Sequence, residues 1–277
     1  MPLQPGEPVS PCMPVAPYIG GKRNLAKRLV PLIDALPCQT YAEPFVGLGG
    51  IFLRRTRRPQ AEVINDLSAD VSGLFRVLQR HYQAFLDMIR WQITTRSEFE
   101  RLVKLDPDSL TDLERAARFL YLQRTAYGGK VNGRNFGVSV GRPGTFDITK
   151  LVPLLEALHE RLAGVVIERL PYDAFLTRYD RPGTLFYLDP PYAGGEQDYG
   201  RRLFQPADFE RLADQLASLA GRFILSINDR PEMRQVFGRF EILEVQTSYS
   251  LNHVKKGQTA AELIVTGPDT WRRELGL

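Results

Sequence analysis

The spacing of apolar positions along the chain predicts alternating strands and helices. Short apolar runs typical of buried strands occur at 40–45, 61–66, 165–170, 184–189, 222–229, 240–247 and 261–267. Between them lie segments with helical spacing, at 21–36, 47–57, 68–91, 150–163, 207–220 and 231–237. This alternation is typical of a largely parallel sheet covered by helices on both faces. The last two runs have no helix between them, so we expect an antiparallel pair of strands at one edge.

The alternation stops between residues 92 and 147. Residues 92–125 show only helical patterns, of which LTDLERAARFLYLQRTA is the clearest. Residues 127–147 are rich in glycine, asparagine and arginine and, outside FGVSV, lack a strand pattern. We therefore expect an α/β, Rossmann-like core with a mostly parallel sheet and an antiparallel edge strand, interrupted by a helical subdomain. The expected parts are a proline-rich arm (1–17), the core (18–91 and 148–268), the inserted subdomain (92–147) and a tail (269–277).

The arm has proline at every third position, at 2, 5, 8, 11, 14 and 17. Three residues per turn is the period of the polyproline II helix, so the rings would line one edge of an extended segment. We expect a loosely ordered terminus rather than a docking motif.

Composition and charge describe an ordinary protein with a mild basic excess. The 277 residues include 36 lysines and arginines against 32 acids, a net charge of +4. Only seven of the bases are lysines, and the planar guanidinium groups of the other 29 suit phosphate contacts. Codon bias accounts for the arginine excess equally well. Two cysteines, no apolar run of membrane-spanning length and no signal peptide lead us to expect a cytoplasmic protein.

A glycine-rich turn follows the first strand of the predicted core. In YAEPFVGLGGIF (41–52), Gly47, Gly49 and Gly50 let the backbone turn tightly beside a ligand. Asp66 ends the next strand, where a carboxylate suits the hydroxyl groups of a ribose. Together the two features predict an adenosine-containing cofactor. Neither the glycine-rich turn nor Asp66 alone would indicate a cofactor, because plain turns also use glycine and an aspartate at a strand end often caps a helix.

The stretch LFYLDPPYAGG (185–195) ends another strand in unusual chemistry, because a diproline cannot extend a strand. A conjugated amino group becomes a nucleophile when two acceptors bind its N–H groups and favour the pyramidal form. Asp189 supplies a carboxylate, and Pro190 a carbonyl whose direction the ring of Pro191 restricts. Tyr192 supplies a face on which a base removed from its duplex can stack. The alternative, a strand followed by a tight proline turn, leaves these residues without a joint role.

These motifs resemble those of the Dam-type adenine-specific DNA methyltransferases. PYIGGKRNL (17–25) resembles the family's amino-terminal cofactor element, EPFVGLGG its glycine motif, IND its ribose-binding acid and DPPY its catalytic tetrapeptide. The match runs from Pro17 to Gly267. The resemblance implies methyl transfer from S-adenosylmethionine to the N6 amine of a flipped adenine, with S-adenosylhomocysteine as the product and no metal.

The resemblance also implies which residues act. Catalysis would fall to Asp189, Pro190, Pro191 and Tyr192. The cofactor would contact Tyr18, Gly21, Lys22, Glu43, Pro44, Phe45, Gly47, Gly49, Asp66 and Asp189. The three histidines are scattered and are better explained as surface or capping residues than as metal ligands: His81, His159 and His253.

The expected partner is double-stranded DNA. FLYLQRTAYGG (119–129) resembles the start of the family's recognition domain, and arginine and asparagine read the edges of guanine and adenine. We expect DNA contacts from Arg124, Tyr127, Lys130, Asn132, Arg134 and Asn135, and phosphate contacts from Lys255 and Lys256. A polar surface loop is the alternative. The family association suggests GATC as the target, a monomer without membrane contact, a bacterial or phage setting and a cognate restriction endonuclease.

Other functions stay open at this point. The amino groups of cytosine, of adenine in RNA or of a protein glutamine suit the same chemistry, although Asp189 and the basic insertion favour adenine in DNA. A non-catalytic DNA-binding relative is a second alternative, and the intact DPPY and EPFVGLGG motifs argue against it. A nicotinamide-dependent oxidoreductase is a third, but it would leave the diproline turn and the basic insertion without a purpose.

Overall fold

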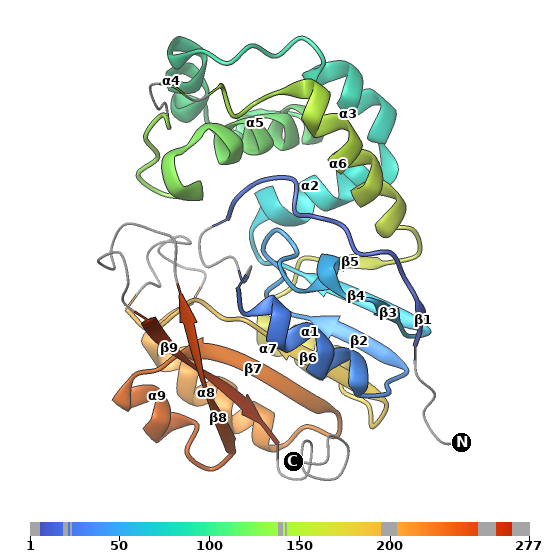
Figure 1. Cartoon of the computed structure of the whole chain (residues 1–277), viewed down its shortest axis with the longest axis vertical. Helices are drawn as coiled ribbons and strands as arrows, with labels where there is room; N and C mark the ends of the chain where they lie inside the picture. Colours follow the sequence, from blue (N-terminus) through green and yellow to red (C-terminus); the bar gives the residue numbers. More distant parts are fainter. Residues whose placement is uncertain are drawn as a thin grey trace.

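A seven-stranded sheet in the order β5-β4-β2-β6-β7-β9-β8 forms the centre of the computed structural model (Figure 1). Its parallel strands are β5 (Val166–Glu168), β4 (Ala61–Asn65), β2 (Thr40–Glu43), β6 (Thr184–Leu188) and β7 (Arg222–Asn228). β9 (Thr259–Thr266) runs antiparallel between β7 and β8 (Glu241–Ser248). The predicted α/β fold with an antiparallel edge pair is confirmed. The structure describes residues 6–18, 22, 24–137, 141, 143–194, 204–248 and 259–267.

Burial on both faces explains why the middle strands are continuous apolar runs. All of β6 (TLFYL) is buried, and its side chains alternate between two cores. Leu185 and Tyr187 share one core with α1 (Ala26–Ala35). Phe186 and Leu188 share the other with helices on the opposite face, α7 (Tyr172–Tyr179), α8 (Pro206–Ala217) and α9 (Pro231–Val236).

A group of helices gathers at one end of the sheet, at the top of Figure 1. It consists of α2 (Ala69–Arg80), α3 (Tyr82–Ile89), α4 (Arg96–Lys104), α5 (Asp112–Thr125) and α6 (Ile148–Arg161). α5 begins at a capping box formed by Thr111 and Glu114. α2 packs against α5, so residues before 92 also join this group, and the domain bounds expected from the sequence stay a prediction. None of the helices in the described part of the chain has the length and apolarity that a bilayer crossing requires.

Two helices expected from the spacing are wrong in part. The helix at 68–91 is interrupted at His81, whose φ of −125° and ψ of 32° are not helical, so α2 and α3 are separate. The segment 47–57 turns at Gly47 and Gly49, with φ of +50° and +76°, which a right-handed helix excludes. A short 3₁₀ turn, η1 (Phe52–Arg54), and strand β3 (Arg57–Arg58) follow. Two more 3₁₀ turns flank α5, η2 (Pro107–Ser109) and η3 (Tyr127–Gly129).

The proline-rich arm is held against the fold from residue 6 onward. Strand β1 (Glu7–Pro8) pairs with β3. Arg124 Nη1 donates to the carbonyl of Val15 at 2.6 Å, and Gln123 Nε2 donates to the carbonyl of Pro17 at 3.0 Å. In Figure 1 the arm, in dark blue, crosses between the sheet and the helical group. The expectation of a loosely ordered terminus is therefore wrong for residues 6–18.

A buried carboxylate joins the sheet to the helical group. Glu62 of β4 has a side chain with 0% exposure and accepts from Arg55 Nη1 at 2.9 Å. It also accepts from Arg161 of α6, Nη1 at 2.6 Å and Nη2 at 2.7 Å, and lies 3.1 Å from Arg58 Nε. Arg55 and Arg161 are themselves buried. Removing the carboxylate would leave two buried guanidinium groups without their shared counter-ion.

Replacing Glu62 by alanine is expected to lower the free energy of unfolding by about 3–5 kcal/mol, because it breaks a buried ionic cluster. Denaturant titration measures the change. The control is Glu100→Ala on the exposed face of α4, which should change stability by less than about 0.5 kcal/mol. A loss for Glu62→Ala no larger than that of the control would contradict the role given to this cluster.

Candidate active site

The carboxyl ends of three adjacent parallel strands meet at one edge of the sheet. β2 ends at Glu43, Asp66 follows β4 and Asp189 follows β6. Open α/β sheets bind their ligands at this edge. A cavity of about 420 Å³ lies there, which is within the usual size range of small-molecule sites, and all three acids line it.

The glycine-rich turn and Asp66 line the cavity together. Asp66 Oδ2 accepts from the Gly47 N–H at 3.0 Å, and Oδ1 accepts from the Ser68 N–H at 2.9 Å. Ser68 is the residue before α2, which has no side-chain cap, so this bond closes the turn ahead of the helix and is not the helix cap considered from the sequence. A Cβ at Gly47 would lie 3.1 Å from the ring of Tyr18. The missing side chain thus lets the Tyr18 ring lie against the turn.

The structure brings together most of the residues expected at a cofactor site. The lining includes Tyr18, Lys22, Glu43, Pro44, Phe45, Gly47, Asp66 and Asp189. Gly49 lies in the same turn with its φ of +76°, and a Cβ there would lie 2.7 Å from Leu53. Gly21 lies outside the described residues.

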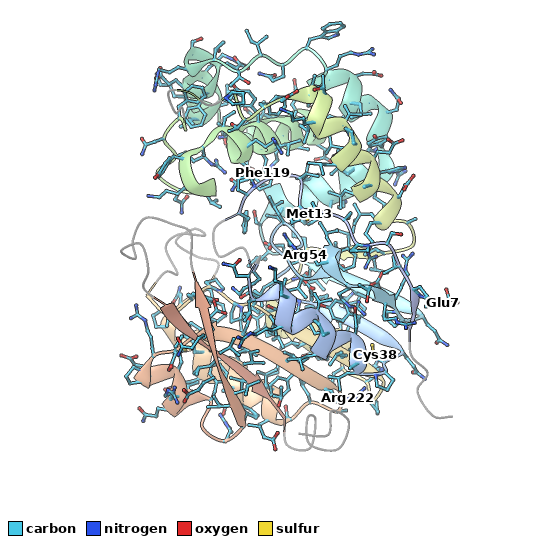
Figure 2. The ribbon with its side chains drawn as sticks, viewed as in Figure 1. Glu7, Met13, Cys38, Arg54, Phe119 and Arg222 are labelled. Carbon is cyan, nitrogen blue, oxygen red and sulfur yellow. The ribbon has the colours of Figure 1, made fainter. Side chains whose placement is uncertain are left out.

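The arm supplies a wall of the cavity that the sequence did not indicate. The lining residues from the arm are Met13, Pro14, Ala16 and Pro17, and the predicted Tyr18 follows them. In Figure 2, Met13 and Arg54 lie between the helical group and the sheet, and both line the cavity. The regular proline spacing was the one sequence signal for an ordered arm, and it says nothing about what the arm covers.

Asp189 lines the cavity where β6 ends, two strands from Asp66, and is paired with Lys22. The Lys22 Nζ atom lies 2.7 Å from Asp189 Oδ1 and 4.2 Å from the centroid of the Tyr192 ring. Ser226 Oγ also donates to Oδ1, at 3.3 Å, and lies 2.8 Å from the Tyr187 hydroxyl. The Lys22 side chain is 3% exposed and that of Asp189 20%. The ammonium group is therefore enclosed, while the carboxylate reaches the cavity.

Asn228, at the end of β7, fixes the turn that carries the DPPY tetrapeptide. Its Oδ1 accepts from the N–H of Ala193 and its Nδ2 donates to the carbonyl of the same residue, both at 3.1 Å. Pro190 is buried, and Pro191 lines the cavity. Sequence reasoning did not assign Ser226 or Asn228. Their alternation in SIND at a strand end is the signal that could have found them.

Burial raises the pKa values of the acids at this edge. It raises the pKa of Glu43 from 4.5 to about 8, although the hydroxyl of Tyr41 donates to the carboxylate at 2.5 Å. It raises the pKa of Asp66 to about 6 against two backbone N–H bonds. The pKa of Asp189 is also raised by burial, and the charge of Lys22 opposes the shift. Shifted acids that line one cavity are typical of a functional site.

The loop after α5 exposes part of the residues expected to contact DNA. Tyr127 is 53% exposed, and Asn132 and Asn135 are exposed as well. The N–H of Tyr127 donates to the carbonyl of Asn135 at 2.8 Å, so the loop folds back on itself. Lys130 is half-buried.

The two arginines expected to read DNA bond within the protein. Arg124 lines the cavity and holds the arm. Arg134 Nη2 donates to Gln123 Oε1 at 3.2 Å, and burial lowers the pKa of Arg134 to about 10. Lys255 and Lys256 lie outside the described residues. The DNA contacts of all these side chains stay a prediction.

Comparison with known proteins agrees with the geometry of the site. A family model described as D12 class N6 adenine-specific DNA methyltransferase matches residues 18–251. The chain belongs to this family. The protein is therefore a DNA methyltransferase of the N6-adenine type, and DNA is its substrate. Family membership favours adenine in DNA over the cytosine, RNA, glutamine and nicotinamide alternatives.

Two type II methyltransferases resemble this D12-class enzyme over nearly their whole length. M.CviBI of Paramecium bursaria Chlorella virus NC1A is 23% identical over 258 residues, which cover 91% of this chain and 96% of that protein. M1.LlaDCHI of Lactococcus lactis subsp. cremoris is 27% identical over 278 residues, with 91% and 94% covered. The family match over residues 18–251 includes the helical group and every strand of the seven-stranded sheet except β9.

The free energy of unfolding without ligands is expected to fall as the pH rises between 4.5 and about 8, with Glu43 as one source. In this window the unfolded chain releases a proton that the folded protein keeps, which costs up to about 1.4 kcal/mol per pH unit. Glu43→Gln removes this source, so its stability should depend less on pH than that of the wild type. Urea titrations across the window measure the slopes, with Glu100→Gln as the exposed control. Equal slopes in all three proteins would contradict the raised pKa of Glu43.

Proposed function

We propose that the methyl donor is S-adenosylmethionine and that the acceptor is the N6 amine of an adenine flipped out of double-stranded DNA, within a specific sequence. S-adenosylhomocysteine would be the product. One observation carries the proposal: a single cavity is lined by Asp66 and the glycine-rich turn and also by Asp189, which follows a strand two places away in the sheet. A nucleoside held at Asp66 would direct the remainder of the same molecule toward Asp189.

The residues of the cavity fit this donor. Each Asp66 oxygen accepts one backbone N–H, and a carboxylate has lone pairs for further bonds from ribose hydroxyls. Gly47 has no side chain to hinder an approach to the backbone. Phe45 and Tyr172, with ring centroids 5.7 Å apart, offer an aromatic wall to a purine. When bound, the donor supplies an electrophilic methyl group on a positively charged sulfur.

The diproline turn would prepare the amine for attack. The carboxylate of Asp189 and the carbonyl of Pro190 accept its two N–H groups, which favours a pyramidal nitrogen with a free lone pair. The ring of Tyr192 stacks on the extruded base. As the nitrogen bonds to the methyl carbon, the bond from that carbon to the sulfur would break and release S-adenosylhomocysteine. The nitrogen would then lose a proton, and Asp189 is the acceptor placed beside it. Positioning and electrostatics supply the acceleration, and no covalent enzyme intermediate is needed.

Asp189→Ala is expected to slow methyl transfer by about a hundredfold or more, because the amine loses its charged acceptor. Transfer of label from S-adenosylmethionine to DNA gives the rate, and nucleoside mass spectrometry identifies N6-methyladenine. Binding of DNA should be retained. The control is Asp214→Ala on the exposed surface of α8, which should keep the wild-type rate. Equal rates for both variants would contradict the proposed role of Asp189. Label found on cytosine would show that the methyl acceptor is cytosine and not adenine.

We also propose GATC as the target sequence, on the family association, with the loop after α5 as the reader. Sequencing of methylated adenines in DNA from cells that express the protein is expected to place them in GATC. Methylation within another sequence would contradict GATC as the target, but it would not contradict the proposed methyl transfer to adenine.

The partner, the oligomeric state and the origin of the protein are also proposed from its relatives and its family. Both relatives are type II methyltransferases by name, which supports a cognate restriction endonuclease as partner. We propose a monomer that acts in the cytoplasm, encoded by a bacterium or a phage.

A further inference from the structure

A second buried acid lies beside Asp189. Glu262 of β9 pairs with Asn228 of β7, and directly paired residues of antiparallel strands point to the same face of a sheet. Glu262 is 1% exposed. Both of its carboxylate oxygens are buried, and within the described ranges neither accepts a hydrogen bond of ordinary geometry, although the Tyr192 hydroxyl is close enough to lower the pKa of the group. Because such a group destabilises the fold, its presence calls for a reason outside folding.

Lys22 and Tyr192 are the neighbours of this carboxyl group. Burial raises the pKa of Glu262, the charge of Lys22 and the hydroxyl of Tyr192 lower it, and the charge of Asp189 raises it further. Lys22 and Asp189 both line the cavity, and Lys22 Nζ lies 2.7 Å from Asp189 Oδ1. One enclosed ammonium group therefore faces two acids, and the acid that it bonds is Asp189.

Lys22 occupies the position that the target base needs. Its ammonium group fills an acceptor of Asp189 that the adenine amine would use. It also lies 4.2 Å above the centroid of the Tyr192 ring, on which the base would stack. The ammonium group has to move before the base can enter. A buried charge that leaves its counter-ion needs another acceptor, because an unpaired buried charge is strongly unfavourable.

We propose that Glu262 receives Lys22 when the flipped adenine enters, and thereby frees Asp189 for the adenine amine. This inference rests on the proposed function of Asp189. No covalent bond changes, since the ammonium group exchanges one carboxylate for another within the same buried cluster. Glu262 is a positioning residue, because it acts on the base only through Lys22. Its two buried oxygens, which accept no hydrogen bond of ordinary geometry in the described structure, are the acceptors that this exchange requires.

Glu262→Gln tests the exchange, because glutamine keeps the shape of the side chain and removes its charge. Thr266→Val is the matched control: it lies on the same strand, and Thr266 Oγ1 is also buried without a partner in the described structure. Three quantities are measured for each protein. They are the single-turnover rate with labelled S-adenosylmethionine and saturating unmethylated genomic DNA, the Tm, and the affinity for S-adenosylhomocysteine.

Glu262→Gln is expected to slow the single-turnover rate by about tenfold to a hundredfold, the effect of losing one hydrogen bond to a charged group. Its Tm should equal or exceed that of the wild type, because an unsatisfied buried carboxylate is gone. The affinity for S-adenosylhomocysteine should not change. Glu262→Asp, which restores the charge on a shorter side chain, should recover part of the rate. Thr266→Val should keep the wild-type rate.

A wild-type rate in Glu262→Gln would overturn the proposal. A lowered Tm together with weaker binding of S-adenosylhomocysteine would also overturn it, because that pattern indicates a structural role. Equal losses in Glu262→Gln and Glu262→Asp would show that the charge is not what matters. Failure of the wild-type protein to methylate adenine would instead remove the proposed function, so the two failures are distinguishable.

Discussion

Parallel pairing of β4, β2 and β6 is the constraint on which the active site depends. The register sets Glu43 opposite Ile64 on one side and Ala42 opposite Phe186 on the other, so the carboxyl ends of the three strands lie level. β2 ends in an acid and an acid directly follows β4 and β6, and the loops that leave this edge lie outside the strand ladder. Ionisable groups can therefore gather there without breaking the sheet. Segments far apart in the chain thus form one cavity.

Two buried glutamates show how this fold separates structural from functional charge. Glu62 and Glu262 are both almost wholly buried on strands. Glu62 is surrounded by the guanidinium groups of Arg55, Arg58 and Arg161, which satisfy it and link the sheet to α6. Glu262 has no such set, and its pKa is raised by burial. A satisfied carboxylate strengthens the fold, whereas an unsatisfied one beside Lys22 keeps acceptors available for a rearrangement.

Elements outside the sheet complete the cavity. The arm forms one wall, and α5 holds the arm through Gln123 and Arg124. The same helix leads into the loop that begins at Tyr127, where DNA contacts are proposed. The wall of the cavity and the proposed DNA reader are therefore parts of one continuous set of contacts. This arrangement explains why Arg124, whose residue type suits DNA, points into the cavity instead.

The sequence by itself determined the alternation of strands and helices, the antiparallel edge pair, and the acids and turns at the strand ends. These features depend on local periodicity and on the local chemistry of glycine and proline. Residues close together in the chain are therefore enough to predict them. Only the tertiary structure decided that the arm covers the cavity, that β9 enters between β7 and β8, and that Glu262 lies beside Lys22. Each of these depends on contacts between residues far apart in the chain. A local sequence pattern does not show which distant residue a segment will contact.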